Sequence, residues 1–379
     1  MPAPSEDAVR AALTTVNDPE INRPITELGM VKSVDISRKG AVTVGVFLTV
    51  AGCPMRDAIT ERVTSAVMAV PDVTSVRVEL DVMSDDQRAA LRNQLRGGEQ
   101  REIPFAKVGS TTKVFAIASG KGGVGKSSVT ANLAVAMAEL GFSVGLVDAD
   151  VYGHSIPRIL NAMEPPTMVE GMIMPPQSYG VRVISMLPFK PGGISQPIAY
   201  RGPMLHRALE QFLSDVWWGD LDVLLLDLPP GTGDIAISTG QLLPNAELVI
   251  VTTPQAAAAD VAVRAGTLAA QMNQKVAGVI ENMSSFPCPC CGEPLDLFGI
   301  GGGDLVASML SSAVDAEVPL LGRIPFDVDL REGGDAGHPI VLAKPDAPAA
   351  VALRDLAQAL ARRPRGITGL SLGITPVGR

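Results

Sequence analysis

The chain has 379 residues, of which 46% are hydrophobic and 19% are charged, so it can bury a sizeable core and is not disordered as a whole. A chain of this length predicts two domains. Its 31 basic and 40 acidic residues give a net charge of -9, which argues against a nucleic-acid-binding protein with a broad basic face. We see no secretory signal and no apolar run of roughly 20 residues, so we expect a cytoplasmic protein with no membrane or nucleic-acid partner.

Residues 1–85 predict a small α/β domain. Its expected elements are helices over residues 5–16 and 56–70 and strands over residues 41–50 and 75–82. Residues 86–110 are rich in charged residues and Gln and almost free of β-branched residues, which indicates a linker.

Residues 111–363 change to a repeated order of strand, loop and helix. The expected strands are short, continuous apolar runs at residues 114–118, 143–147, 223–226, 248–251, 276–280 and 320–324. Such runs are typical of strands that are buried on both faces of a parallel sheet. We therefore predict an α/β fold with a doubly wound, mostly parallel sheet of the P-loop NTPase kind, followed by a flexible tail at residues 364–379.

A phosphate loop directly follows the first of these strands. It consists of Gly120, Lys121, Gly122, Gly123, Val124, Gly125, Lys126 and Ser127, with Ser128 next. This stretch matches the GxxxxGK(S/T) pattern and opens a predicted helix that runs to about residue 140. The glycines let backbone N–H groups surround phosphate oxygens. Lys126 is expected to reach the β- and γ-phosphates, and the Ser127 hydroxyl to ligate Mg²⁺.

Acidic side chains follow the second and third of these strands. Asp148 and Asp150 end the second strand, and Asp227 follows four apolar residues of the third. Ligands of parallel sheets bind at the carboxyl ends of the strands, so we expect all three near the phosphate loop. Asp227 has the Walker B arrangement and is expected to hold Mg²⁺. For Asp148 or Asp150 taken alone, an acidic cap of the next segment is the alternative.

The residues that follow the strand at 276–280 indicate which nucleotide base the protein binds. GTPases read guanine through an Asn-Lys-x-Asp pattern at the end of a late strand. Here Asn282 follows the strand, but no Asp stands three residues further on. We therefore expect ATP as the nucleotide.

Three of the four cysteines fall within residues 288–291. Cys288 and Cys291 form a C-x-x-C pair whose two thiolates can converge on one soft metal, which is half of a Cys₄ site. The sequence does not separate iron from zinc at this position. A redox-active thiol pair and an apolar turn that contains cysteines are the other interpretations. Cys290 is expected to be a reserve ligand or a spectator, because adjacent side chains tend to point apart.

The phosphate loop resembles that of the deviant P-loop ATPases, the superfamily of MinD, ParA and the nitrogenase iron protein, because of its extra lysine, Lys121. The resemblance implies a homodimer in which Lys121 reaches the partner's phosphates. It also implies that Asp150 orients the attacking water and that Asp148 lies near the Mg²⁺ shell. Catalysis would then rest on Lys121, Lys126, Asp150 and Asp227. Asn282 would contact the adenine, and residues 325–327 would line the same pocket.

Four motifs together, GKGGVGKS, DADVYG, DLPPGTGD and ENMSSF with CxxCG and LDLFGxGGG after it, resemble the Mrp/ApbC family of iron-sulfur cluster carrier ATPases. The match runs from residue 120 to residue 303, and REGGDAGHP extends it to residue 339. The resemblance implies an Mg²⁺-dependent ATPase that binds a labile [4Fe-4S] cluster between two subunits through Cys288 and Cys291. Scaffold proteins would donate the cluster and apo-proteins would receive it. Cys290 departs from the pattern, because the family usually has another residue there.

The N-terminal domain resembles the small domain that is fused to Mrp proteins and occurs in cluster-assembly factors. The residues that carry this resemblance are Asp18 to Ile21, Glu27 to Val31 and Leu48 to Pro54. Cys53 lies at a predicted junction of strand and helix, where a helix N-terminus lowers a thiol pKa and favours cluster or thiol chemistry. A buried, inert cysteine is the alternative.

Two other functions compete with the cluster carrier. A positioning ATPase of the MinD/ParA kind needs a basic amphipathic C-terminal helix or a basic surface, and residues 366–379 are neither. An ATPase with a structural zinc site would use the same Cys288 and Cys291. A nitrogenase-type reductase fits less well, because its cluster cysteines are single and well separated along the chain.

Overall fold

The structure is a computed structural model that describes residues 4–19, 21, 23–48, 56–84, 87, 91, 102–107, 109–150, 153, 155–186, 202–272, 274–288 and 290–363. Cys53, the predicted tail at residues 364–379 and most of the predicted linker at residues 86–110 lie outside this set. The chain divides into two compact units. The first consists of Met1–Arg101 with Thr167–Met174, and the second of Glu102–Pro166 with Pro175–Arg379.

The first unit packs two helices against a three-stranded sheet. Its elements are α1 (Glu6–Leu13), β1 (Val31–Ile36), β2 (Ala41–Leu48), α2 (Arg56–Met68) and β3 (Ser75–Val82), with the hairpin of β6 (Thr167–Val169) and β7 (Met172–Met174). Strand β2 pairs antiparallel with β1 and parallel with β3. Helix α1 begins where the Ser5 hydroxyl accepts a hydrogen bond from the Ala8 amide. Helix α2 buries a residue at every fourth position, Ile59, Val63 and Val67, and so presents one apolar stripe.

An eight-stranded sheet forms the centre of the second unit, in the order β15-β12-β11-β4-β10-β5-β9-β8. Its strands are β4 (Lys113–Ser119), β5 (Val144–Asp148), β8 (Gln177–Ser178), β9 (Val181–Ser185), β10 (Val223–Asp227), β11 (Glu247–Thr252), β12 (Val276–Asn282) and β15 (Leu320–Ile324). All neighbours pair in parallel except β8 with β9. The central strands are continuous runs of buried apolar residues, which is the reason why both faces of the sheet are covered by helices.

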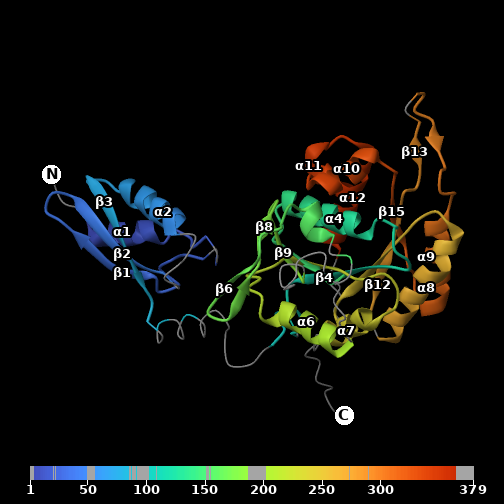
Figure 1. Ribbon diagram of the computed structural model, residues 1–379, viewed down its shortest axis with the longest axis horizontal. Helices are drawn as coiled ribbons and strands as arrows, with labels where there is room; N and C mark the ends of the chain where they lie inside the picture. The colour runs from blue at the N-terminus through green and yellow to red at the C-terminus, as the bar shows by residue number, and fades with distance from the viewer. Residues whose placement is uncertain are drawn as a thin grey trace, which may run out of the picture. The chain divides into compact units, whose positions relative to one another are not determined.

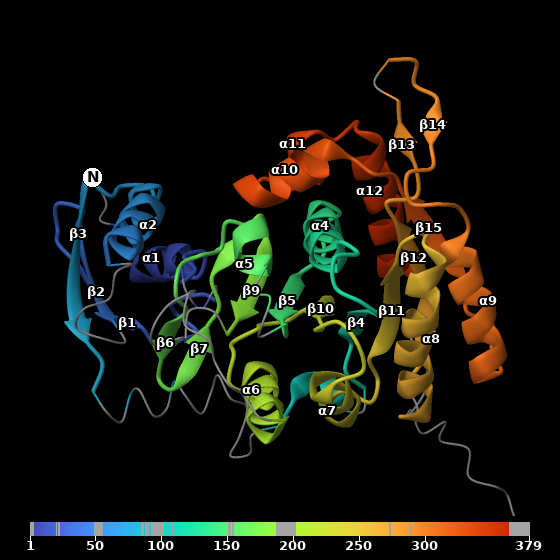
Figure 2. The same cartoon turned by 45° about the vertical axis from the view of Figure 1, so that its right-hand side comes forward.

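Helices cover both faces of this sheet (Figure 1, Figure 2). One layer holds α4 (Lys126–Glu139), α10 (Val328–Ala336), α11 (Ile340–Ala343) and α12 (Pro348–Arg362), and the other holds α6 (Gly202–Ser214), α7 (Asp234–Leu242), α8 (Ala256–Gln271) and α9 (Gly302–Val314). Shorter elements are η1 (Pro104–Ala106), α5 (Ile156–Ile159), β13 (Phe286–Pro287) and β14 (Pro294–Leu295). A large apolar core lies between the sheet and the layer of α4 and α12.

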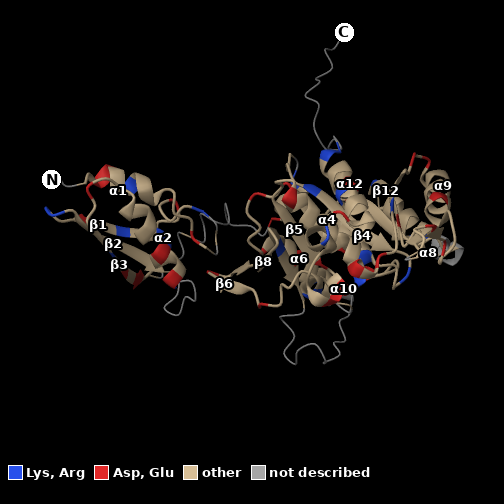
Figure 3. Cartoon of the chain, turned by 90° about the horizontal axis from the view of Figure 1, so that it is seen from above, with Lys and Arg blue, Asp and Glu red and all other residues tan. Residues whose placement is uncertain are grey.

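The predicted fold class is confirmed, and all six predicted strands of the second unit are present. The sequence did not predict β1 or the strands between β5 and β10. Strand β1 is half-exposed and β9 carries Arg182, so neither shows a continuous apolar run. Lys and Arg are interspersed with Asp and Glu in both units (Figure 3). No helix of the described chain is long and apolar enough to cross a membrane.

Candidate functional site

The phosphate loop joins the end of β4 to the start of α4. Gly123 and Gly125 have φ angles of 81° and 80°, a left-handed conformation that favours glycine. A Cβ on Gly125 would also lie 2.3 Å from the Asn282 amide nitrogen. The predicted loop residues, from Lys121 to Ser128, line a cavity of about 250 Å³. Backbone conformation therefore explains the glycine at position 123, and backbone conformation and close packing together explain the one at position 125.

Asp227 is the centre of the polar network beneath the loop. Its carboxylate accepts hydrogen bonds from the Ser127 hydroxyl at 2.6 Å and from the Thr130 hydroxyl at 2.8 Å. The Lys126 ammonium forms an ion pair with the same carboxylate at 2.7 Å. Both charged side chains are almost completely buried, with 6% of Lys126 and none of Asp227 exposed. The structure thus brings together the three residues for which the sequence predicted phosphate and Mg²⁺ contacts.

Asp148 lies beside Asp227, because β5 and β10 pair these two residues in register. The Ser185 hydroxyl donates to Asp148 at 3.2 Å, and the Gly153 amide donates to Asp150 at 2.9 Å. Burial raises the pKa of Asp148 well above its usual range, and the neighbouring Asp227 charge raises it further. The carboxyl groups of Asp148, Asp150 and Asp227 thus share this region with the single ammonium of Lys126, and a bound divalent cation would favour their charged forms.

The ammonium of Lys121, the other lysine of the loop, has a different partner from that of Lys126. It donates a hydrogen bond of 2.7 Å to the side-chain oxygen of Gln255, the residue before α8. Lys121 lines the phosphate cavity but makes no ion pair with any described residue. The structure therefore separates the two loop lysines, one on Asp227 and the other on an uncharged amide.

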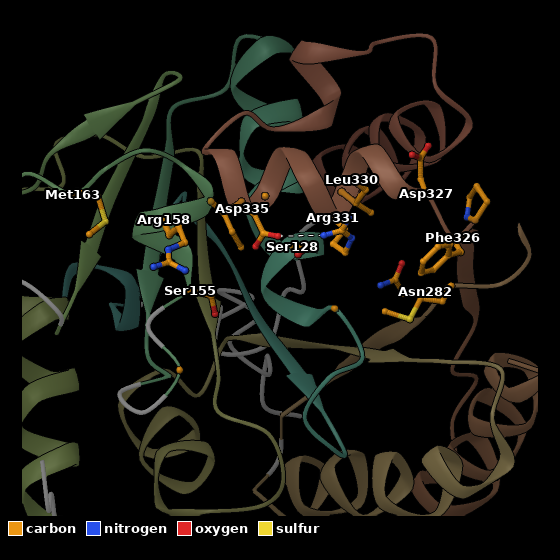
Figure 4. Close-up of a pocket in the computed structure, with 16 residues that line it drawn as sticks. Ser128, Ser155, Arg158, Met163, Asn282, Phe326, Asp327, Leu330, Arg331 and Asp335 are labelled. Carbon is orange, nitrogen blue, oxygen red and sulfur yellow. Dashed lines mark ion pairs between the residues drawn. The ribbon is translucent and has the colours of Figure 1, made fainter. Parts of the chain in front are cut away.

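A second cavity of about 480 Å³ adjoins the phosphate cavity and shares Gly125, Ser128, Ser155 and Ile159 with it. Asn282 and residues 325–327 line this cavity (Figure 4). The Asn282 amide nitrogen donates to the Val124 carbonyl at 2.9 Å, while its buried oxygen has no hydrogen-bond partner in the described structure. An acceptor of this kind suits the exocyclic amino group of adenine. The two joined cavities suit the phosphates and the nucleoside of one nucleotide.

The cysteines lie on a short hairpin that projects from the second unit (Figure 2). Strands β13 and β14 pair antiparallel, and the Gly292 amide donates to the Cys288 carbonyl at the turn. Cys290 and Cys291 are exposed and Cys288 is half-buried, all three with free thiols. The backbone amides of Cys290 and Cys291 donate to the Cys288 sulfur and lower its pKa, as do both neighbouring thiols to a smaller extent. Among the described residues, no three Cys, His, Asp or Glu side chains gather as a metal site.

Three aromatic rings join the nucleotide cavity to the cysteine hairpin. Phe326 lines the cavity, and its ring centre lies 5.6 Å from that of Phe286, at the base of the hairpin. Phe298, which follows the hairpin, lies 6.0 Å from Phe326. The Phe326 amide also donates to the Ser285 carbonyl at 2.6 Å. These contacts connect the wall of the nucleotide cavity to the base of the cysteine hairpin.

Comparison with protein families settles the relationship of this chain. Residues 110–361, more than half of the chain, match the family of the NUBPL iron-transfer P-loop NTPase, and residues 6–80 match a family described as iron-sulfur cluster assembly protein. The chain belongs to the NUBPL iron-transfer P-loop NTPase family. The resemblance to P-loop ATPases of iron-sulfur cluster transfer, drawn from the motifs, is confirmed, and so is the predicted NTPase class.

Relatives of this P-loop NTPase are named iron-sulfur cluster carrier proteins. The one from Mycobacterium tuberculosis is 58% identical over 373 residues, which are 98% of this chain and 97% of the relative. The one from Deinococcus radiodurans is 42% identical over 357 residues, 94% of each chain. A solved nucleotide-binding protein from Archaeoglobus fulgidus, in complex with ADP, is 36% identical with a TM-score of 0.53 and covers 65% of this chain and 95% of its own.

Three residues of the NTPase site were not predicted from the sequence. Thr130 stands four residues after Lys126, on the same face of α4, so helical spacing was a usable signal. Ser185 and Gln255 reach the site from β9 and from the start of α8. Nothing in their local sequence marks them, because only the sheet order brings them to the phosphate loop.

Proposed function

We propose that this NTPase is an ATP-dependent iron-sulfur cluster carrier that acts as a cytoplasmic homodimer. The observation that carries the proposal is the position of β12, which serves both sites. The strand ends with Asn282 in the nucleotide cavity, and the cysteine hairpin begins four residues later at Phe286. The names of the relatives and the family support cluster transfer as the function.

The residues beneath the phosphate loop fit Mg²⁺. This ion prefers oxygen ligands such as hydroxyls and carboxylates, and Ser127 and Asp227 present both within 2.6 Å of each other. Asp148 lies next to Asp227 and adds a further carboxylate oxygen. When bound, Mg²⁺ neutralises charge on the β- and γ-phosphates. Lys126 would hold the same phosphates, and Asp150, at the edge of the phosphate cavity, would orient the attacking water.

The cluster is the cargo, and the thiols of the half-buried Cys288 and the exposed Cys291 would hold it. Two thiolates from each of two chains make the four that a [4Fe-4S] cluster takes. The backbone amides of Cys290 and Cys291 lower the pKa of Cys288 and so favour its thiolate, which is the form that binds iron. An exposed position lets a scaffold protein deliver the cluster and an apo-protein remove it.

ATP would change the hold on the cluster through the three phenylalanines. A nucleotide that fills the cavity contacts Phe326, and Phe326 packs on Phe286 at the base of the hairpin. For ATP to drive transfer, the nucleotide-bound and nucleotide-free states must differ in their affinity for the cluster. Phe286 belongs to the hairpin itself, so a shift of Phe326 would be passed to the strand that leads to Cys288.

Anaerobic reconstitution with iron and sulfide tests this proposal. The wild-type chain is compared with Cys288→Ala/Cys291→Ala, and Cys290→Ala serves as the matched control from the same turn. We expect about two irons for each wild-type chain, hence about four for each dimer, with visible sulfide-to-iron absorption. The double variant should bind none, and the control should bind as the wild type does.

Two further measurements complete the test. Light scattering of the loaded protein should give the mass of a dimer, and ATP should speed delivery of the cluster to an apo-ferredoxin. Stoichiometric zinc without iron uptake would contradict the proposal and make the cysteines structural. Iron bound equally by the double variant would place the cluster elsewhere in the chain.

A further inference from the structure

Gln255 occupies an unusual position for its residue type. It is the N-cap of α8, where Ser, Thr, Asp and Asn are preferred because their short side chains can accept from the helix's free amides. The Gln255 side chain makes no such capping bond. Its oxygen instead accepts from the Lys121 ammonium at 2.7 Å. Capping therefore does not explain Gln255, whereas its contact with the phosphate loop does.

Helix α8 also packs closely against the loop in its second turn. A Cβ on Gly120 would lie 2.4 Å from the Ala262 backbone nitrogen and 2.5 Å from the Val261 carbonyl carbon. This contact holds the backbone of α8 next to the residue that precedes Lys121. Gln255 begins the same helix six residues before Val261, so the packing of α8 places its backbone within reach of Lys121.

We propose that Gln255 is a positioning residue, which holds the Lys121 ammonium ready for the terminal phosphate of ATP. The inference rests on the proposed function, because it assumes that the loop binds a nucleoside triphosphate. An amide suits this task better than a carboxylate does. It orients the ammonium through one hydrogen bond, leaves two N–H donors and does not neutralise the charge that the phosphate needs.

Lys121 and Lys126 then have different tasks. Lys126 and Ser127 lie on the buried Asp227 and hold the phosphates in every nucleotide state. The contact between Lys121 and Gln255 is exposed, and Lys121 forms no ion pair with Asp148 or Asp227 in the described structure. Loss of Gln255 should therefore affect the response to the γ-phosphate and spare the binding of the diphosphate.

Three variants at this one position separate positioning from a structural role. Gln255→Asn is a better helix cap but too short to reach Lys121, and Gln255→Ala removes both possibilities. Gln255→Glu keeps the length, is favourable at a helix N-terminus, and neutralises Lys121. If Gln255 only supports α8, the Asn and Glu variants should match or exceed the wild type in thermal stability and activity.

We expect the opposite for activity. The Asn and Ala variants should lose about tenfold in kcat, the effect of losing one hydrogen bond to a charged group, and the Glu variant should lose more. The affinity for ADP and the melting temperature of the Asn variant should stay at the wild-type level. In a Lys121→Ala background, the same substitutions should cause no further loss, because the two residues act as a unit.

A second measurement does not depend on hydrolysis. The ratio of the dissociation constants for ADP and a slowly hydrolysed ATP analogue reports contact with the γ-phosphate, and it should fall in all three variants. Unchanged kcat and an unchanged ratio in the Asn variant would overturn the inference, as would an equal loss in the Lys121→Ala background. A wild-type chain that neither hydrolyses ATP nor binds the analogue would instead overturn the proposed function.

Discussion

The nucleotide site and the cysteine hairpin are built in opposite ways. Asp148 and Asp227 are fully buried at the ends of central strands, and each has several hydrogen-bond or ion-pair partners. Cys290 and Cys291 are exposed on a hairpin of two short strands. The carboxylates of the nucleotide site are enclosed by the chain's own residues, whereas the thiols of Cys290 and Cys291 are open to solvent.

The difference matches what each site must do. A nucleotide that is bound repeatedly needs a preorganised site, and burial keeps the charged groups in place. A cluster that is passed on must be reachable by other proteins, so its ligands cannot be enclosed. The phenylalanine contacts between Phe326, Phe286 and Phe298 are the physical link between the two sites.

The largest expected effect is a loss of ATP hydrolysis without a loss of iron binding. Lys126→Ala removes the cation that pairs with Asp227 and would hold the phosphates, so ATP hydrolysis should fall on the order of hundredfold or more. Iron loading should persist, because the cysteines lie outside this network. Phosphate release and iron content for each chain measure the two quantities.

Ser127→Ala gives a second test of the same separation, because it removes only the hydroxyl that donates to Asp227. It should lower the Mg²⁺-dependent rate with less effect on stability than Lys126→Ala has. Iron loading that disappears together with hydrolysis in both variants would show that the two sites are not independent.

Differences in local sequence pattern explain which features of the molecule could be predicted from the sequence. Lys126, Asp148 and Asp227 could be predicted because local patterns mark them, namely a glycine-rich loop and acids at the ends of apolar strands. The fold class followed from the same apolar runs, whereas the half-exposed β1 did not. Gln255 could not be predicted, because its contact with Lys121 spans 134 positions and depends on the order of the strands.

The packing of the nucleotide site should make it intolerant of a single methyl group. Gly120→Ala would place its Cβ 2.4 Å from the Ala262 backbone nitrogen, and a backbone atom cannot move away cheaply. We expect a loss of about 1–3 kcal/mol in the free energy of unfolding, measured by denaturant titration. Gly122→Ala is the control, since a Cβ there meets nothing within 4 Å. Equal losses in both variants would contradict this account of the packing.

The contact between Phe286 and Phe326 can be weakened without changing a residue that lines the nucleotide cavity. Phe286→Leu keeps an apolar side chain at the hairpin base but removes the ring pair with Phe326, worth about 0.5–1.5 kcal/mol. The factor by which ATP speeds cluster release should therefore fall a few-fold, while ATP hydrolysis stays at the wild-type level. Release kinetics of the reconstituted protein with and without ATP measure this factor. An unchanged factor would mean that the coupling runs through another contact.

The smallest expected effect is on stability. Burial of Asp148 at the nucleotide site should lower the free energy of unfolding at neutral pH, and the sign follows from the pKa of this residue. Burial and the Asp227 charge raise this pKa in the folded chain, whereas an unfolded Asp has a pKa of about 3.9. Above that pH the unfolded chain has released a proton that the folded chain still binds, so the free energy of unfolding falls as the pH rises.

Asp148→Asn removes this dependence. The magnesium- and nucleotide-free variant should be more stable than the wild type at pH 7, on the order of 1 kcal/mol, and the gain should vanish near pH 4. Urea titrations at the two pH values measure it. A gain that is equal at both would assign the effect to the hydrogen bond with Ser185 and not to the buried charge.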